Sequence, residues 1–384
     1  MLEGCSVVVV GAGFFGATIA ERVANDLHRP VGLIERRRHV GGAAYSEVDR
    51  STGIEVHKFG THVFHTSSEE VWSYIRKFAE FNDYRHRVVA HHGGQIYSLP
   101  FNLHTISTFF GRHYSPLEAR QLIADHIAAE RIGALDNLEA KAVSAIGRPL
   151  YEAFVRGYTL KQWGIDPKEL PKSIIERLAI RFNFNDRYFS DRYEGVPIEG
   201  YSKIFERMLA SPLIRWLPST DFFSVRHEIP PDILVVYTGP IDRFFDCRFG
   251  ALSWRTLRFE NETLPLADYQ GTGVVNYPDL EVPFTRIHEF RHLHPERKIP
   301  AEVGTIISRE YSSSAMPDSD PFYPIGTVKD RSIYELYRTR ARELKNTIFG
   351  GRLGTYRYLD MHQAIGAALM TFQTEILPRF ANNR

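Results

Sequence analysis

Two short motifs in this sequence combine residue types and spacings that could support chemistry. The first is His288-Glu289-Phe290-Arg291-His292, which has the H-E-x-x-H spacing of zinc hydrolases. Two histidines at this spacing share an ion only on a helix, because four residues of strand separate their side chains by roughly 13 Å. The flanking segments are rich in β-branched and aromatic residues and are interrupted by prolines, which predicts strands. We therefore interpret the motif as a chance match on a strand and expect no metal site.

The second motif is the glycine-rich run Gly11-Ala-Gly-Phe-Phe-Gly16. It follows the apolar run 6–10, which is typical of a buried parallel strand, and it precedes a predicted helix over 17–27. The first glycine permits a tight turn, the second lets a pyrophosphate approach the backbone, and the third lets the helix pack closely on the strand. The run therefore predicts a dinucleotide-binding site at the N-terminus of that helix.

The cofactor bound by such a motif contains an ADP half, which both NAD and FAD have. Glu35 lies at the end of the next predicted strand, residues 31–34, where an acidic side chain accepts the ribose hydroxyls. The pair Gly41-Gly42 follows shortly after this acid, and such a pair is typical of flavoenzymes of the amine-oxidase kind. We expect FAD, although an ordinary loop at Gly41-Gly42 remains the alternative.

The composition limits the class of protein. Apolar residues make up 43% and charged residues 24% of the 384 positions, which is typical of a globular protein and excludes a disordered chain. A formal charge of +1 gives no basic footprint for nucleic acid or for an anionic membrane. No run is long and apolar enough to span a bilayer, and the two cysteines, Cys5 and Cys247, suit a reducing compartment. We expect a cytoplasmic protein of two or three structural units.

The rest of the chain contains segments that predict helices and segments that predict strands. Residues from about 103 to 172 show helical spacing, with Ser115 placed to cap one of the helices. Residues 182–197 and 251–311 are aromatic and β-branched with frequent turn residues, which predicts a sheet assembled from separate segments. Asp360 is placed as the N-cap of a late helix.

Several further motifs occur in order along nearly the whole chain. They are His57-Lys-Phe-Gly-Thr-His-Val-Phe-His65, Leu99-Pro-Phe-Asn102, Gly157-Tyr-Thr-Leu-Lys-Gln-Trp-Gly164, Lys168-Glu-Leu-Pro171, Tyr188-Phe-Ser-Asp191, Tyr237-Thr-Gly-Pro240, Pro283-Phe-Thr-Arg286, Phe349-Gly-Gly-Arg-Leu353 and Asp360-Met-His362. Together with the glycine motifs, they resemble bacterial UDP-galactopyranose mutases. Agreement in order over this length excludes a chance match.

The resemblance implies an α/β fold with a discontinuous, Rossmann-like FAD-binding domain, an inserted helical domain and an antiparallel β-sheet domain. We expect the FAD-binding domain to comprise residues 1–80, 201–250 and 324–384. We expect the helical domain to comprise residues 101–180, with a mobile lid loop at about 164–177 that closes over the substrate. We expect the sheet domain to comprise residues 81–100, 181–200 and 251–323.

The resemblance also implies the reaction, an interconversion of UDP-galactopyranose and UDP-galactofuranose with no net redox change. In such enzymes FAD acts in its reduced form. Its N5 attacks the anomeric carbon, and the resulting flavin–sugar adduct opens through an iminium and recloses as the five-membered ring. The implied product supplies galactofuranose for cell-surface glycans. The implied external reductant is NADH or NADPH, and the implied assembly is a homodimer.

Residue by residue, the resemblance assigns roles around the substrate. Arg177 and Arg286 match two catalytic arginines that hold the UDP pyrophosphate, for which planar guanidinium groups are suited. Without the resemblance, a surface ion pair would be the better interpretation of either arginine. The matched substrate-binding residues are Phe154, Tyr158 and Trp163, which stack the uracil and cover the sugar, the phosphate-binding Tyr188, Tyr323 and Tyr358, and Asn276.

The resemblance assigns a second set of residues to the flavin. His62 matches a histidine beside the flavin, which we count with the two arginines as catalytic. Positive charge and helix N–H groups near the flavin N1 edge favour the anionic reduced form. The implied cofactor-binding residues are Gly11, Gly13, Phe14, Phe15, Gly16, Glu35, Arg36, Gly41, Gly42, His62, Arg352, Asp360 and Met361. The positions that depart from the family pattern, and so bear on affinity or sugar preference, are Thr61, Ala179, Phe322 and Leu359.

Two other functions remain open. The N-terminal motif equally suits an amine-oxidase-like FAD oxidoreductase, which would act with oxidised flavin on an oxidisable substrate. A non-catalytic module that holds FAD as a structural element would bind UDP irrespective of the flavin redox state. The paired arginines and the tyrosines suit a diphosphate and favour the mutase. The residues do not decide whether N-acetylated UDP-sugars are also substrates.

Overall fold

A parallel sheet contains the glycine-rich motif at its centre. The computed structural model describes residues 2–175, 178, 180–316 and 318–381. Five parallel strands lie in the order β16 (Thr347–Phe349), β10 (Leu234–Tyr237), β1 (Val7–Val10), β2 (Val31–Ile34) and β9 (Ile214–Leu217). All four valines of β1 are buried, as expected of a strand covered on both faces.

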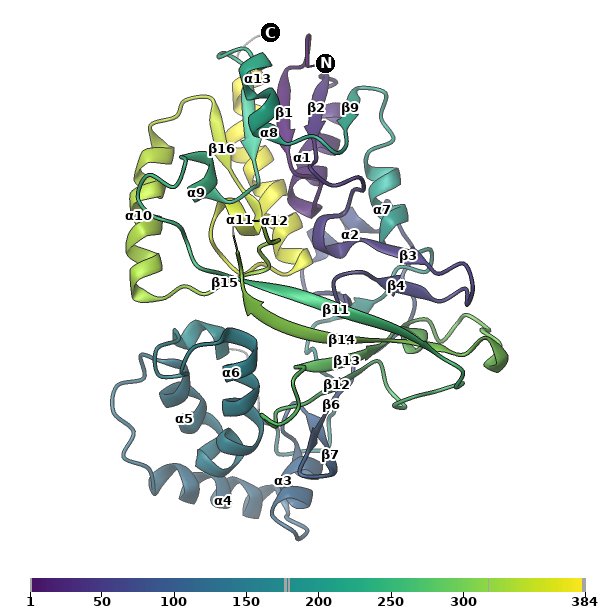
Figure 1. The fold of residues 1–384 in the computed structure, drawn as a ribbon, viewed down its shortest axis with the longest axis vertical. Helices are drawn as coiled ribbons and strands as arrows, with labels where there is room; N and C mark the ends of the chain where they lie inside the picture. The colour runs from purple at the N-terminus through teal and green to yellow at the C-terminus, as the bar shows by residue number, and fades with distance from the viewer. Residues whose placement is uncertain (1, 176–177, 179, 317, 382–384) are drawn as a thin grey trace.

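Helices pack on both faces of the parallel sheet (Figure 1). On one face, α1 (Phe14–Asn25) and α12 (Met361–Thr371) contact each other and bury apolar side chains with Val7 and Val9. On the other face, α8 (Phe222–Val225) and α9 (Ile241–Phe244) pack against Val8 and Val10. The other helices of this part are α2 (Glu69–Ile75), α7 (Tyr201–Met208), α10 (Val328–Arg342), α11 (Gly351–Gly354) and α13 (Leu377–Ala381).

A second, larger sheet lies beside the first, and its long strands β11 and β14 cross the middle of the molecule (Figure 1). Its strand order is β15 (Tyr323–Pro324), β11 (Trp254–Leu264), β14 (Thr305–Ser314), β13 (Arg286–Glu289), β12 (Val274–Asn276), β6 (Val88–His92) and β7 (Gln95–Leu99). All its strand pairs are antiparallel except β12 with β6. These two strands are far apart in the chain, so the connection between them is long enough to allow parallel pairing, which a short hairpin would not.

Four short strands form two small sheets. β3 (Ser46–Val48) pairs with β4 (Glu55–His57), and β5 (Phe64–Thr66) pairs with β8 (Tyr193–Gly195). Residues 182–197 were expected to contribute to the large sheet, but their strand β8 pairs with β5 outside it. The turn residues around β8 leave it only three residues long.

A helical unit lies on the far side of the large sheet from the parallel sheet (Figure 1). It consists of α3 (Leu103–Phe109), α4 (Pro116–Ala128), α5 (Leu138–Leu150), a π-helical stretch (Tyr151–Arg156) and α6 (Gly157–Trp163). Ser115 caps α4 in a capping box with Glu118, which confirms the predicted cap. Leu138, Ile146 and Leu150 of α5 form part of the core of this unit.

The fold class predicted from the sequence is confirmed. The strands of the parallel sheet all lie within residues 1–80, 201–250 and 324–384, and the helical unit lies within 101–180. The domain boundaries themselves stay a prediction. Within the described residues, no helix combines the length and the apolar character needed to cross a bilayer.

Candidate active site

One cavity with a volume of about 2400 Å³ is lined by residues of both sheets and of α6. Sites for a single drug-sized ligand usually measure about 300–1,000 Å³. This cavity therefore has room for two ligands, such as a dinucleotide and a nucleotide sugar. The glycine-rich motif lines one part of it, and strands β12 to β14 line another.

The glycine-rich motif forms a cradle at the N-terminus of α1. Gly11 adopts a φ of 99°, and a Cβ at Gly16 would lie 1.9 Å from the carbonyl oxygen of Gly11. Gly13 is the N-cap, and no described side chain caps the helix there, so the first N–H groups of α1 can bind a ligand. Phe14 and Phe15 open the helix and also line the cavity.

Glu35 and the Gly41-Gly42 pair lie against this cradle. Glu35 is buried, and its carboxylate accepts hydrogen bonds from the N–H groups of Ala12 at 2.8 Å and Arg37 at 2.9 Å. The Gly41 N–H donates to the Ala12 carbonyl oxygen at 2.8 Å. Arg36 lines the same part of the cavity and forms an ion pair with Asp320. The cradle, the uncapped helix and the fixed carboxylate fit the ADP half of a dinucleotide.

His62 also lines this cavity. Its Nδ1 lies 2.7 Å from the carbonyl oxygen of Gly60 and donates to it, which leaves Nε2 as an acceptor. Burial lowers the pKa of His62 to about 4, and the charge of Arg352 acts in the same direction. The imidazole is therefore neutral at physiological pH.

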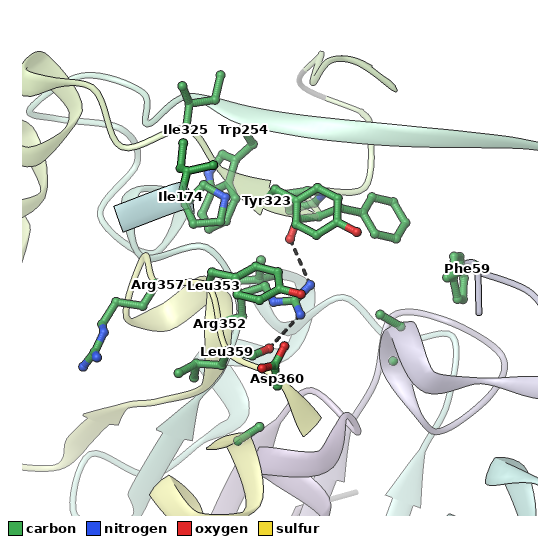
Figure 2. A pocket seen from close by; sticks show the side chains of 18 of the residues that line it. Phe59, Ile174, Trp254, Tyr323, Ile325, Arg352, Leu353, Arg357, Leu359 and Asp360 are labelled. Atoms are coloured by element: carbon green, nitrogen blue, oxygen red, sulfur yellow. Dashed lines mark hydrogen bonds between the residues drawn. The ribbon is translucent and has the colours of Figure 1, made fainter. Parts of the chain in front are cut away.

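Arg352 and the start of α12 line another part of the cavity. The guanidinium donates to the carbonyl oxygen of Leu359 at 2.7 Å (Figure 2). It also donates to the carbonyl oxygen of Phe322 at 3.1 Å and lies 4.8 Å from the ring centre of Tyr358. Asp360 caps α12 in a capping box, as predicted, and Met361 opens the helix. The N-terminus of this helix and the fixed positive charge of Arg352 suit a cofactor that carries negative charge.

Arg286 lies in the part of the cavity formed by the large sheet. Its Nη2 donates a hydrogen bond to the Tyr158 hydroxyl, and its guanidinium lies 5.6 Å from the Tyr158 ring centre. The Nε atom lies 3.4 Å from Glu310 Oε1 and has no hydrogen-bond partner among the described residues. The Arg286 guanidinium is therefore charged and anchored on one side.

Glu310 is the buried carboxylate that balances this charge. Its Oε2 accepts from His288 Nε2 at 3.1 Å, and His288 Nδ1 in turn accepts from the Thr61 N–H at 3.2 Å. Burial alone would raise the pKa of Glu310, but Arg286 and His288 lower it to about 2. A continuous chain of contacts thus connects the loop of His62 to Arg286 and Tyr158.

Sequence reasoning missed Glu310 and the role of His288. In the sequence, His288 belongs to the H-E-x-x-H motif, and Glu310 is one charged residue of a long strand. The structure confirms that the motif begins on a strand, β13, and the His288 and His292 side chains face different partners, Glu310 and Asp268. Only the register of β13 with β14, which pairs Arg286 with Glu310, identifies the carboxylate.

Asn276 and Phe154, both expected at the nucleotide, differ in how much of each side chain is available to a ligand. Asn276 lines the cavity, and its buried Oδ1 has no hydrogen-bond partner in the described part of the chain, as expected of an atom reserved for a ligand. Phe154 also lines the cavity, but it is 6% exposed and packs edge-on against Tyr97 at 4.9 Å between ring centres. Phe154 therefore presents a small part of its surface to a ligand.

The other expected aromatic residues surround Arg286 and Arg352. Trp163 and Tyr323 lie with their ring centres 6.1 Å apart, and Tyr323 lies 5.7 Å from Tyr358. Every described residue expected at the site lines the one cavity: Gly11, Gly13, Phe14, Phe15, Gly16, Glu35, Arg36, Gly41, Gly42, His62, Phe154, Tyr158, Trp163, Tyr188, Asn276, Arg286, Tyr323, Arg352, Tyr358, Asp360 and Met361. Arg177 lies outside the described residues, as do Ala179 and the end of the expected lid.

Comparisons with known proteins agree with this geometry. The family described as UDP-galactopyranose mutase matches residues 153–358, and a family of NAD(P)-binding Rossmann-like domains matches residues 9–78. A probable UDP-galactopyranose mutase of Klebsiella pneumoniae is 41% identical over 98% of this chain and 96% of its own length. The chain belongs to the UDP-galactopyranose mutase family.

One further relative and one solved structure are also similar to the chain over nearly its whole length. A dTDP-fucopyranose mutase of Escherichia coli is 40% identical over 96% of this chain and 98% of its own length. A crystal structure of a reduced UDP-galactopyranose mutase superposes with a TM-score of 0.72 at 16% identity, covering 99% of this chain and 98% of that one, which shows a common fold. Membership of the family makes the chain an isomerase and supports interconversion of pyranose and furanose forms of a nucleotide-linked sugar.

Proposed function

We propose that the protein interconverts UDP-galactopyranose and UDP-galactofuranose with the help of reduced FAD. One observation carries the proposal: a dinucleotide-binding cradle and an anchored arginine line a single cavity. A nucleotide sugar held by Arg286 would have its anomeric carbon within the same enclosure as the reactive ring of the cofactor. Neither an amine oxidase nor a structural FAD module requires this arrangement.

The residues present fit FAD. The ADP half would be held by the cradle of Gly11 to Gly16 together with Glu35, Arg36 and the Gly41-Gly42 pair, and the flavin by His62, Arg352 and the start of α12. Reduced flavin supplies a nucleophilic nitrogen, N5, for the anomeric carbon. Because His62 is neutral, it can accept a hydrogen bond at Nε2 without adding to the positive charge of Arg352.

The substrate side depends on charge and on aromatic surfaces. Arg286, with Arg177, would bind the diphosphate and stabilise the negative charge that develops on UDP as the glycosidic bond breaks. Tyr188, Tyr323 and Tyr358 would donate to the phosphates, and Phe154, Tyr158, Trp163 and Asn276 would surround the base and the sugar. Glu310 would keep Arg286 in position and leave the guanidinium edge that faces the cavity for the phosphates.

The deciding experiment is conversion of UDP-galactofuranose by the purified yellow protein, followed by chromatography with and without dithionite. We expect UDP-galactopyranose only after reduction. Conversion by the oxidised protein, or the absence of conversion in both states with FAD bound, would refute the proposal. Oxidation of an amine by the oxidised protein would instead support the oxidoreductase.

A thymidine-linked 6-deoxysugar is a second candidate substrate. The observation that favours it is the 40% identity to the dTDP-fucopyranose mutase, nearly equal to the identity with the probable UDP-galactopyranose mutase. Phe322 and Leu359 also line the cavity with apolar side chains, which suit a sugar that lacks a hydroxyl. Competition between UDP-galactofuranose and dTDP-fucofuranose for the reduced protein gives the ratio of kcat/KM and decides between the two.

We propose a cytoplasmic homodimer that uses NADH or NADPH as reductant and supplies galactofuranose for cell-surface glycans. Two free cysteines, one of them exposed, support a reducing compartment. The lid at about 164–177 would follow Gly164, which ends α6 with a φ of 66° and so provides a flexible junction.

A further inference from the structure

Lys161, on α6, holds its ammonium group among four backbone carbonyl oxygens. Nζ lies 2.5 Å from the oxygen of Tyr277, 2.8 Å from that of Asp279, 2.9 Å from that of Val282 and 3.0 Å from that of Phe284. An ammonium has three protons, so all of them are used, and one is shared. Hydrogen bonds from a charged donor are about twice as strong as those between neutral groups.

This cage joins α6 to the turn between β12 and β13. Asn276 is the last residue of β12 and Arg286 is the first residue of β13, so the turn links the two substrate-facing strands. The helix also lies directly on the turn, because a Cβ at Gly157 would come within 2.3 Å of the Pro278 carbonyl oxygen. The hydrogen bond from Arg286 to Tyr158 crosses the same junction.

The other side of α6 is attached to the large sheet. Arg255 on β11 donates from Nε to the Gln162 carbonyl oxygen at 2.8 Å and from Nη2 to that of Lys161 at 3.3 Å. Ser312 on β14 donates to the same Gln162 oxygen at 2.6 Å. These bonds satisfy carbonyl groups at the C-terminal end of the helix, where positive charge is favourable. They fix the end of α6 to the sheet without touching the turn, whose other side is held by Asp279, which accepts hydrogen bonds from His92 Nδ1 and, at 3.1 Å, from the Gly93 N–H.

We infer that Lys161 is a positioning residue of the active site, which locks the turn between β12 and β13 onto α6. Lys161 is not among the residues that line the cavity, so it acts on the ligand only through Tyr158, Asn276 and Arg286. With the cage intact, these three side chains keep one geometry in the absence of ligand. The inference rests on the proposed function, since it treats Arg286 and Asn276 as binding residues for a nucleoside diphosphate.

The test uses UDP as the probe and compares the FAD-loaded protein with its Lys161→Met variant, which keeps the length of the side chain and removes its charge. We expect UDP to bind about tenfold more weakly, a loss typical of removing a charge-assisted hydrogen-bonding group. KM for the nucleotide sugar should rise similarly, with a smaller change in kcat and unchanged FAD content. The matched control is Lys203→Met, because Lys203 lies on α7 and pairs with the exposed Glu206. Unchanged UDP binding by a folded Lys161→Met protein would overturn the inference.

If Lys161→Met does not fold, a second variant, Lys161→Ala, tests the inference. Lys161→Ala leaves space for a small cation, and we expect ethylammonium chloride to restore UDP binding, whereas tetramethylammonium chloride at the same ionic strength should not. Equal effects of the two salts would overturn the inference. Wild-type protein that neither binds UDP nor turns over the nucleotide sugar would instead refute the proposed function, so the two failures are distinguishable.

Discussion

Arg286 and Glu310 face each other across β13 and β14, with Arg286 Nε 3.4 Å from Glu310 Oε1. Glu310 is 2% exposed, while the arginine side chain keeps access to the cavity. A buried charge without a partner is strongly destabilising, so Glu310 allows a permanent cation to sit at the wall of the cavity. The remaining guanidinium N–H groups can then bind an anion in a fixed orientation.

Replacing Arg286 with alanine should reduce turnover of the nucleotide sugar by roughly several hundredfold, since a charge-assisted contact to the phosphates of the transition state is lost. FAD should stay bound, because the cradle at α1 is not in contact with Arg286. Steady-state kinetics and the flavin absorbance of the purified variant measure both quantities. Arg258→Ala is the control, because Arg258 is 59% exposed on strand β11 of the same sheet and pairs with Glu260. Near-normal turnover in Arg286→Ala would remove Arg286 from the active site.

The Glu310 carboxylate gives stability a defined pH dependence. Its pKa is lowered to about 2 in the folded protein, against 4.5 ordinarily, so its contribution is complete above pH 4.5 and is lost as the pH falls toward 2. In Glu310→Gln, the decrease in the free energy of unfolding between pH 6 and pH 3.5 should be smaller by about 1 kcal/mol. Urea denaturation at the two pH values measures the free energy of unfolding of the wild-type protein and of the variant. Glu262→Gln, at an exposed glutamate of β11, is the control, and an unchanged decrease in Glu310→Gln would contradict the prediction.

Gly16 should be essential for binding FAD. A Cβ at this position would lie 1.9 Å from the Gly11 carbonyl oxygen, so Gly16→Ala must displace either the glycine-rich loop or α1. We expect the variant to be purified with little or no flavin, as measured by the absorbance ratio of flavin to protein. Gly133→Ala is the control, because a Cβ there meets no atom within 4 Å. A yellow Gly16→Ala protein with normal flavin content would show that the loop tolerates the displacement.

The features that the sequence predicted correctly are local in the chain. The glycine-rich motif, the acid after the second strand and the caps at Ser115 and Asp360 each depend on residues within one supersecondary unit. The strand at His288 could likewise be inferred from the prolines and β-branched residues around it. In these cases short-range sterics and hydrogen bonding determine the conformation.

The features that could not be predicted depend on strand register or on contacts between residues that are far apart in the sequence. Glu310 acquires its role only because β13 and β14 align Arg286 with it. The carbonyl groups that bind Lys161 lie more than 100 positions later in the chain, and no local pattern indicates that they converge. Phe154 was expected at the nucleotide from the family pattern, whereas its packing against Tyr97 of β7 follows from the way the helical unit packs on the large sheet.

His62 should remain neutral over the pH range in which such an enzyme works. Burial lowers its pKa from 6.5 to about 4, so the folded protein keeps the imidazole neutral down to well below pH 6. The unfolded chain takes up this proton first, so the contribution of neutral His62 to stability is lost as the pH falls from about 6.5 toward 4. NMR of protein labelled with nitrogen-15 in its histidines should show His62 in the tautomer with the proton on Nδ1 between pH 5 and pH 8. His62→Gln assigns the signal by its disappearance. A titration of that signal near pH 6.5 would contradict the lowering of the His62 pKa by burial.

Trp163 should report closure of the loop that follows it. The residue ends α6 beside Tyr323, and Gly164 turns the chain away from the helix immediately afterwards. Binding of UDP to the reduced protein should change the tryptophan fluorescence, because the indole would become shielded when the loop covers the ligand. Trp163→Phe should lose most of the change, whereas Trp216→Phe, at a residue 44% exposed on β9, should keep it. If Trp163→Phe retained the whole signal, the loop after Gly164 would not be the part of the protein that responds to UDP.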